Sequence, residues 1–144
     1  MNQKKLYVIA GCNGAGKTTA SFNILPEILD CKEFVNADEI ARGLSPFRPE
    51  QVAIAAGRMM LALIQDLLNS GDNFSFETTL STRSFVKTIE HAKSKGYYTT
   101  IIFFYLESVD LALDRVSIRV SEGGHNIQKD VVKRRYYLGI KNLF

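Results

Sequence analysis

The first residues with clear chemical potential form a glycine-rich segment near the start of the chain. Residues 11–18 read GCNGAGKT and fit the pattern G-x-x-x-x-G-K-[ST] at every defined position. Small residues let the backbone curl so that successive amide N–H groups point into one concavity, where they can bind phosphate oxygens. The ammonium group of Lys17 can reach the β- and γ-phosphates of a nucleotide, and the Thr18 hydroxyl can ligate Mg²⁺. The sequence therefore predicts an ATP-binding phosphate loop formed by Gly11, Cys12, Asn13, Gly14, Ala15, Gly16, Lys17, Thr18 and Thr19.

A glycine-rich turn between a strand and a helix could match this pattern by chance. The position of the motif argues against chance, because it follows the apolar run 6–10 and opens a helix, as phosphate binding requires. Cys12 lies inside the loop, and we interpret it as a small filler rather than a nucleophile. The motif does not separate ATP from GTP, although a guanine signature of the N/TKxD type is absent.

Two acidic residues follow later predicted strands. Asp38 comes just after the segment 33–36, where it could accept a proton from a substrate hydroxyl or hold Mg²⁺ through water. The alternative is that Asp38 caps the helix that follows it. Glu77 and Thr78 end the next strand, and we expect them to contact substrate hydroxyls or metal-bound water. The alternative for Glu77 is a solvated strand end.

Basic residues gather toward the end of the chain. The segment 115–141 holds seven Lys and Arg residues against only Glu122 and Asp130. A mobile lid of arginines can stabilise the charge of a phosphoryl group in transfer and exclude water. The alternative is a solvated basic helix face. Arg83, at the start of an earlier predicted helix, could contact an anionic substrate or lie on the surface. The lid candidates flank Gly123 and Gly124, and they are Arg115, Arg119, Arg134 and Arg135.

The elements that must position these residues alternate between strand and helix. Continuous apolar runs, such as 101–104, are typical of strands buried between two helical layers. The alternation predicts an α/β fold with a parallel sheet of about four to five strands and right-handed crossovers. Ligands of such sheets bind beyond the carboxyl ends of the strands, where the loop, Asp38 and Glu77 stand. We expect strands over residues 6–10, 33–36, 74–76 and 99–106, and helices over 17–25, 49–69, 84–95, 109–120 and 129–142.

Composition narrows the class of protein. The chain has 144 residues, of which 46% are hydrophobic and 23% charged, as in an ordinary globular domain. A formal net charge of +3 does not by itself suggest nucleic-acid or membrane binding. Cys12 and Cys31 have no partners at metal-ligand spacing, so we expect neither a disulfide framework nor a zinc site. We see no signal peptide and no stretch near the roughly 20 apolar residues of a membrane span, and we expect a soluble, cytoplasmic protein.

Four stretches of the sequence together resemble the zeta-toxin-like P-loop kinases. They are residues 11–18, residues 35–41 (VNADEIA), residues 76–80 (FETTL) and residues 119–125 (RVSEGGH). The first stretch is generic to P-loop proteins, whereas the second and third in this order are more specific. The likeness is strongest to small, stand-alone bacterial members. It covers nearly the whole chain, so residues 1–144 are identified as one kinase domain.

The resemblance implies a three-layer α/β/α P-loop NTPase kinase fold and transfer of the γ-phosphate of ATP to a hydroxyl group. Carried over, it implies that Lys17 and Thr18 bind ATP and Mg²⁺, that Asp38 activates the acceptor hydroxyl as a base, and that Glu77 helps to bind substrate. Zeta toxins phosphorylate the sugar of UDP-N-acetylglucosamine, and an antitoxin blocks their nucleotide site. A sugar-nucleotide acceptor and an antitoxin are therefore candidate partners.

The resemblance also implies a lid over residues 119–130 with two arginines that serve the phosphates. Arg119 is our first choice, with Arg115 or Arg134 as the second. Gln128 stands where the family's lid usually has a proline. This departure predicts a looser lid.

Family members usually continue past the segment 129–142 into a further strand, whereas this chain stops at Phe144. We therefore expect the domain to lack its last strand and the strand at 99–106 to form an exposed edge that invites self-association. Two other functions stay open: a nucleotide-binding interaction module without kinase activity of its own, and an antitoxin-controlled toxin. Motifs do not name the phosphate acceptor, because specificity lies in the shape of the pocket.

Overall fold

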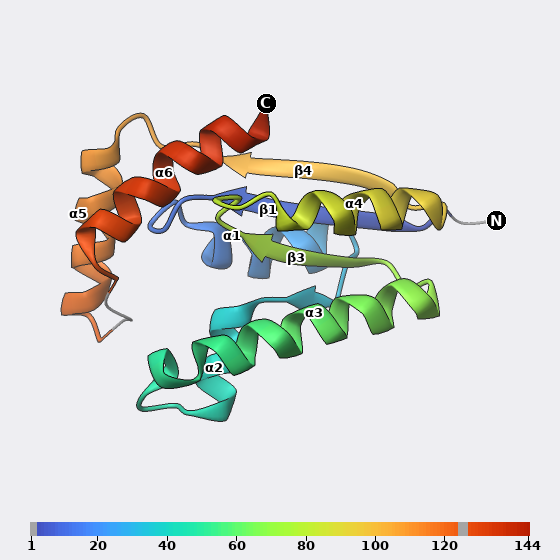
Figure 1. The fold of residues 1–144 in the computed structure, drawn as a ribbon, viewed down its shortest axis with the longest axis horizontal. Helices are drawn as coiled ribbons and strands as arrows, with labels where there is room; N and C mark the ends of the chain where they lie inside the picture. The colour runs from blue at the N-terminus through green and yellow to red at the C-terminus, as the bar shows by residue number, and fades with distance from the viewer. Residues whose placement is uncertain (1–2, 124–126) are drawn as a thin grey trace.

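Strands and helices alternate along the chain in the computed structural model, which describes residues 3–123 and 127–144 (Figure 1). The four strands are β1 (Lys5–Gly11), β2 (Phe34–Val35), β3 (Phe74–Thr78) and β4 (Tyr98–Phe104). The helices are α1 (Lys17–Asn23), α2 (Ala37–Leu44), α3 (Ala53–Ser70), α4 (Ser84–Ser94), α5 (Val109–Ser121) and α6 (Lys129–Leu143). A π-helical turn (Ile24–Ile28) extends α1, and a 3-10 turn (Pro49–Val52) leads into α3. Each predicted strand and helix is present, and α2 is one that we did not assign.

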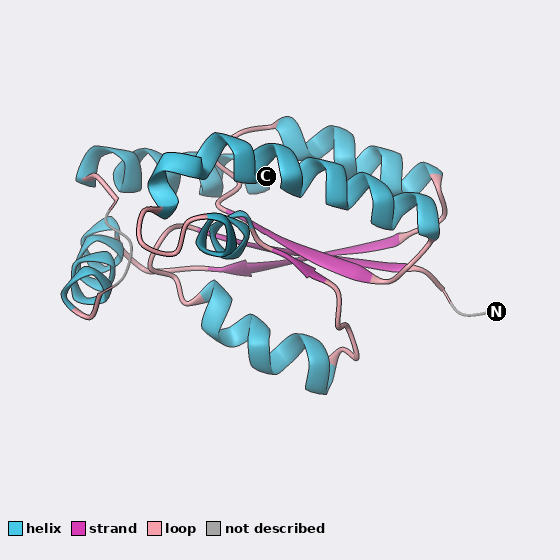
Figure 2. Cartoon of the chain, turned by 90° about the horizontal axis from the view of Figure 1, so that it is seen from below, coloured by secondary structure: helices cyan, strands magenta, loops and turns pink. Residues whose placement is uncertain are grey.

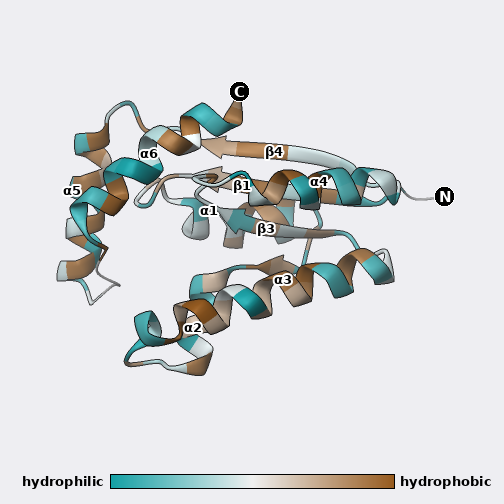
Figure 3. Ribbon diagram, in the orientation of Figure 1, coloured by the Kyte–Doolittle hydropathy of each residue, from teal (hydrophilic) through white to brown (hydrophobic). Residues whose placement is uncertain are grey.

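The four strands form a single sheet in the order β2-β3-β1-β4, and all three pairs are parallel. This confirms the predicted parallel sheet. Central β1 pairs on both sides, so that Val8 lies between Phe76 and Ile101. β4 lies at one edge, as expected for the strand at 99–106, and its hydrophobic half leads toward α5 and α6 (Figure 3).

Both faces of the sheet are covered by helices, which makes the fold a three-layer α/β/α arrangement (Figure 2). Leu6 and Val8 pack on one face in a cluster with residues of α3 and α4. Tyr7 and Ile9 point to the opposite face, where they pack with Leu25 of the turn after α1. Because successive side chains of a strand alternate between faces, an apolar run with no polar position is what a strand between two layers needs.

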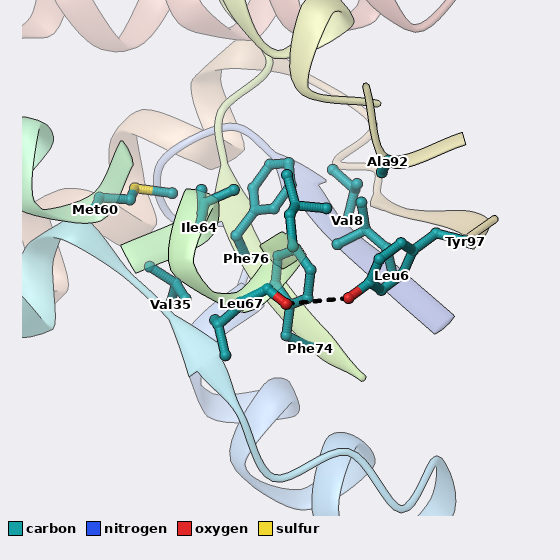
Figure 4. Packing of buried hydrophobic residues seen from close by; sticks show 11 residues of the cluster. Leu6, Val8, Val35, Met60, Ile64, Leu67, Phe74, Phe76, Ala92 and Tyr97 are labelled. Carbon is teal, nitrogen blue, oxygen red and sulfur yellow. Dashed lines mark hydrogen bonds between the residues drawn. The ribbon is translucent and has the colours of Figure 1, made fainter. Parts of the chain in front are cut away.

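α3 buries only part of the apolar stripe that its sequence predicts. The three- and four-residue spacing of Val52, Ala56, Met59, Leu63 and Leu67 predicts one buried face; Ala56 and Leu67 are buried, whereas Met59 and Leu63 are 48% and 42% exposed. The helix is rich in apolar residues on several sides, so the spacing alone left its rotation open. Gly71 ends the helix with a left-handed φ of 78°, as expected for a glycine at this place. The side chains that pack on the sheet are Ala56, Met60, Ile64, Leu67 and Leu68, several of them visible with Phe74 and Phe76 in Figure 4.

The same helix corrects one expectation about membranes. Among the described residues, Pro49–Ser70, a stretch of 22 residues, is long and apolar enough to cross a membrane by length and composition. We had expected no such stretch. A single helix of this kind is weak evidence for a membrane span, because core helices of water-soluble proteins also pass this test. Its buried face packs on β2 and β3, within the core cluster.

Candidate active site

The loop between β1 and α1 has the conformation that phosphate binding needs. Gly16 begins α1 with a left-handed φ of 86°, and Gly11 and Gly14 also have positive φ angles. Residues with a side chain rarely adopt these angles, which explains the glycines of the motif. Lys17 is buried, and its ammonium group donates hydrogen bonds to the carbonyl oxygens of Gly11 and Cys12, the latter at 3.1 Å. The motif thus folds into a curled loop that holds its lysine close to the backbone.

Glu77 joins the loop to the end of β3. Its carboxylate accepts hydrogen bonds from the Thr18 hydroxyl at 2.9 and 3.1 Å, and one of its oxygens lies 3.8 Å from the ammonium nitrogen of Lys17. The amide nitrogen of Asn36 donates a short hydrogen bond to the same carboxylate. The predicted nucleotide-binding pair and the predicted substrate-binding acid therefore touch each other.

Burial perturbs both charged members of this group. It raises the pKa of Glu77, and the nearby Lys17 charge and the Thr18 hydrogen bond oppose that rise only in part. Burial also lowers the pKa of Lys17, opposed in part by Glu77. Titratable groups with shifted pKa values are more frequent at functional sites than on an ordinary protein surface, where side chains stay solvated.

Asn36 has a role that sequence reasoning missed. Its side-chain oxygen accepts hydrogen bonds from the backbone N–H groups of Asp38 at 2.8 Å and Glu39 at 3.4 Å, so Asn36 is the N-cap of α2. The alternative that Asp38 caps this helix is therefore wrong, and Asp38 stands in the first turn instead. The signal was available, because asparagine two residues before an acid, at the end of a strand, is a common way to begin a helix.

The site residues surround a cavity of about 480 Å³ above the phosphate loop. Asp38, Glu77 and Thr78 line it together with Lys17 and Thr18, so the strand-end acids do converge on the loop. A second cavity of about 250 Å³ shares lining residues with the first. The residues that line both are Asn13, Ala37, Asp38, Arg119 and Arg135.

The arginines divide into those that reach the cavity and those that do not. Arg119 lines it, as expected for our first choice, and its positive charge also acts on Glu77. The other lining arginine near the loop is Arg135, whose guanidinium donates a hydrogen bond of 3.1 Å to the side chain of Asn13. Its neighbour Arg134 is exposed and lines neither cavity. Burial lowers the pKa of Arg135, while Asp38 opposes that effect.

Four other predicted site residues, Gly11 among them, line neither cavity. Arg115 has its guanidinium beside the loop, where a Cβ added to Gly16 would lie 3.6 Å from it. Arg83 and Thr19 are exposed and line neither cavity. Of the predicted lid over 119–130, the residues Gly124, His125 and Asn126 lie outside the described part of the chain.

The ligand chemistry around Thr18 suits Mg²⁺. A hydroxyl and a carboxylate meet there, and hard divalent cations of this kind prefer oxygen ligands and usually take several of them from phosphates and water. Within residues 3–123 and 127–144 no group of three or more His, Cys, Asp and Glu side chains could hold a metal by itself. The donor set thus fits a cation that arrives with a nucleotide.

Comparison with known proteins agrees with this geometry. A sequence profile of the zeta toxin family matches residues 1–142. A protein of Haemophilus influenzae Rd is 34% identical over 145 residues, which cover 94% of this chain and 100% of that protein. A solved structure of a candidate kinase from Chloroflexus aurantiacus has a TM-score of 0.71 at 18% identity, covering 92% of this chain and 76% of that one.

A further solved structure comes from the PezAT chromosomal toxin–antitoxin system of Streptococcus pneumoniae. It has a TM-score of 0.72 at 20% identity, and the match covers 97% of this chain but only 62% of that one. At such identities the likeness shows the fold alone. Fold and phosphate loop together define a P-loop kinase architecture. The chain belongs to the zeta toxin family.

Proposed function

We propose that this protein transfers the γ-phosphate of ATP to a hydroxyl group of a small molecule. The observation that carries the proposal is one cavity in which the phosphate loop, with Lys17 and Thr18, faces the two carboxylates Asp38 and Glu77. Membership of a family of P-loop kinases supports ATP as the nucleotide. The cavity offers room for the end of a triphosphate and for a second molecule beside it.

In this reaction Asp38 accepts the proton of the acceptor hydroxyl while the hydroxyl oxygen attacks the γ-phosphorus. The bond between that phosphorus and the oxygen bridging to the β-phosphate breaks, and ADP leaves. Lys17 contacts the β- and γ-phosphate oxygens, and Arg119 and Arg135 approach the transferred group from α5 and α6. Thr18 would hold Mg²⁺, which would supply positive charge to offset that of the phosphates.

The test uses ATP labelled at the γ-phosphate and a metabolite extract as the source of acceptors. We expect Asp38→Asn to lower the rate of label transfer by about 10²- to 10⁴-fold while ATP affinity, measured by calorimetry, stays the same. Lys17→Met should weaken ATP binding at least about tenfold, because it removes charged hydrogen bonds to phosphate. Asp66→Asn is the matched control, since Asp66 is an exposed acid of α3 outside the cavities.

Two results would contradict this proposal. Full transfer by the Asp38→Asn variant would remove Asp38 as the base. ATP binding with no labelled small molecule in any extract would favour the alternative function, a nucleotide-binding interaction module.

A toxin held by an antitoxin is a second candidate, which the family and the likeness to a toxin–antitoxin system favour. Growth arrest on expression of the chain, abolished by Asp38→Asn, would support a toxic kinase. Unimpaired growth at high expression would speak for a metabolic role. We place either activity in the cytoplasm, where ATP is supplied.

A further inference from the structure

One face of α3 turns toward the cavity and not toward the core. The lining residues Ile54, Gly57, Arg58 and Leu61 follow the spacing i, i+3, i+4 and i+7, which places them on one side of a helix. Ile54 and Leu61 are 77% and 54% exposed. Apolar side chains at the mouth of a cavity gain stability when a ligand covers them.

Gly57 opens space on this face. Glycine inside a helix is less favourable than alanine, so its presence here needs a reason. Packing does not supply one, because a Cβ built at Gly57 meets no atom within 4 Å. The missing side chain therefore leaves room in the cavity, between the positions of Ile54 and Leu61.

Arg58 adds a positive charge to the same wall. α3 packs over β2 and β3, whereas the phosphate loop extends from β1, so Arg58 approaches the cavity from a different side than the loop. In Figure 1 α3 begins near the end of the sheet at which β1 and β3 terminate. No carboxylate among the described residues forms a salt bridge with Arg58. Cations therefore outnumber acids around the cavity, with Lys17, Arg58, Arg119 and Arg135 against Asp38 and Glu77.

We propose that Arg58 and Gly57 determine which phosphate acceptor binds: Arg58 binds an anionic group of the acceptor, a phosphate or a carboxylate, and Gly57 leaves room for an apolar or ring-shaped part. This inference rests on the proposed kinase function and names the residues of α3 that select its small-molecule substrate. Lys17, Arg119 and Arg135 contact the nucleotide near the loop, which leaves Arg58 for the second molecule. A planar guanidinium binds carboxylate or phosphate oxygens in pairs and orients the hydroxyl toward Asp38.

The first experiment separates a metabolite extract by anion exchange into neutral and anionic fractions and assays each with γ-labelled ATP. Labelled product is expected from the anionic fraction. The anionic fraction is also treated with a phosphatase, which is removed before the assay. This step distinguishes a phosphate from a carboxylate, because only a phosphate-bearing acceptor loses its anionic group. Product from the neutral fraction alone would overturn the inference and leave the kinase function standing.

The second experiment changes the α3 wall. At low acceptor concentration Arg58→Gln should lower the transfer rate about 10- to 100-fold, through KM rather than kcat, with ATP affinity unchanged. Arg58→Lys should retain part of the rate, since it keeps the charge but not the paired geometry. The control Arg48→Gln removes an exposed arginine outside both cavities. A rate for Arg58→Gln equal to that of the unmodified protein would overturn the role of Arg58.

Gly57 has a matched control in Gly43 of α2, where an added Cβ also meets nothing within 4 Å but no cavity is lined. Gly57→Leu should raise KM for the acceptor at least about tenfold, because its side chain fills space that the substrate needs. Gly43→Leu should leave KM unchanged. Equal KM values for both variants would contradict the role of Gly57. Loss of all product from every fraction, with ATP still bound, would remove the proposed transfer itself and with it this inference.

Discussion

Individual side chains in this protein serve the fold and the site at once. Glu77 lies next to the last residue of β3, accepts a hydrogen bond from Thr18 of the phosphate loop and another from the amide of Asn36, and is mostly buried. A carboxylate in such a place loses solvation, which favours its neutral form. The local hydrogen bonds compensate this loss only in part, so the raised pKa of Glu77 has a consequence for stability.

We predict that Glu77→Gln changes how stability depends on pH. Because the folded pKa of Glu77 lies above the ordinary value of 4.5, the folded state binds the proton more tightly than the unfolded state between these two pKa values. The Glu77 contribution therefore falls as pH rises through this window. The free energy of unfolding of Glu77→Gln, minus that of the unmodified protein, should grow over the window and then level off. A difference that is flat with pH, measured by urea unfolding, would contradict this.

Residue types predicted much of the site, and geometry decided the rest. The phosphate loop is contiguous in sequence, so its eight-residue pattern could be recognised without the fold. Arg134 and Arg135 are adjacent, and only the packing of α6 decides that Arg135 faces Asn13. No sequence pattern pointed to Arg58, because its proposed role depends on a cavity that forms only when distant segments of the chain come together.

At the scale of elements, two side-chain hydrogen bonds hold α6 across the end of the sheet. The Tyr136 hydroxyl donates a hydrogen bond of 2.8 Å to the carbonyl oxygen of Leu106, and the Asn142 amide donates one of 2.8 Å to that of Leu80. Between them, Gly139 lets the helix approach the loop that follows β3. These contacts fix the helix that presents Arg135 to the phosphate loop.

Gly139→Ala should therefore destabilise the protein. Its Cβ would lie 2.6 Å from the carbonyl oxygen of Thr79, too close for any real contact, so helix and loop must move apart. We expect a loss of about 1–3 kcal/mol in the free energy of unfolding, as for other overpacked sites. Gly43→Ala is the matched control and should leave stability unchanged or raise it by up to about 1 kcal/mol. Equal effects of both substitutions in chemical unfolding would argue against the close contact.

Elements were easier to predict than their rotation. β1 and β4 are apolar runs next to turn residues, and short-range pattern is enough to find them. α3 is apolar around much of its circumference, so its spacing could not tell the core face of Met60 and Ile64 from the exposed positions Met59 and Leu63. α2 is amphipathic, but it has only eight residues and begins directly after the two-residue strand β2, so we did not separate it from a turn.

At the scale of the whole molecule, the sheet has an accessible border along β4. This strand pairs with β1 alone among the described strands, and Tyr98 and Ile101 are 67% and 41% exposed. An apolar strand with unpaired backbone groups on one side can pair with a strand of another molecule.

We predict that the protein self-associates through this strand at high concentration. The weight-average mass measured by light scattering should rise with concentration, and Ile101→Lys should reduce the rise, because a charged residue on an edge strand opposes pairing. Ile118→Lys is the control, since Ile118 of α5 is also exposed but lies away from the edge. A constant monomer mass over the whole range would contradict the prediction.

Asn36 has two structural roles, and this limits the substitutions that protein engineering can make at this position. The Asn36 side-chain oxygen caps the start of α2 and its amide nitrogen donates a hydrogen bond to Glu77, so a substitution at this position alters the helix start and the cavity together. We assign no such double role to the face of α3 that lines the cavity. If the proposed transfer is confirmed, a designer who wishes to change its acceptor can diversify positions 54, 57, 58 and 61 and leave Asn36 untouched.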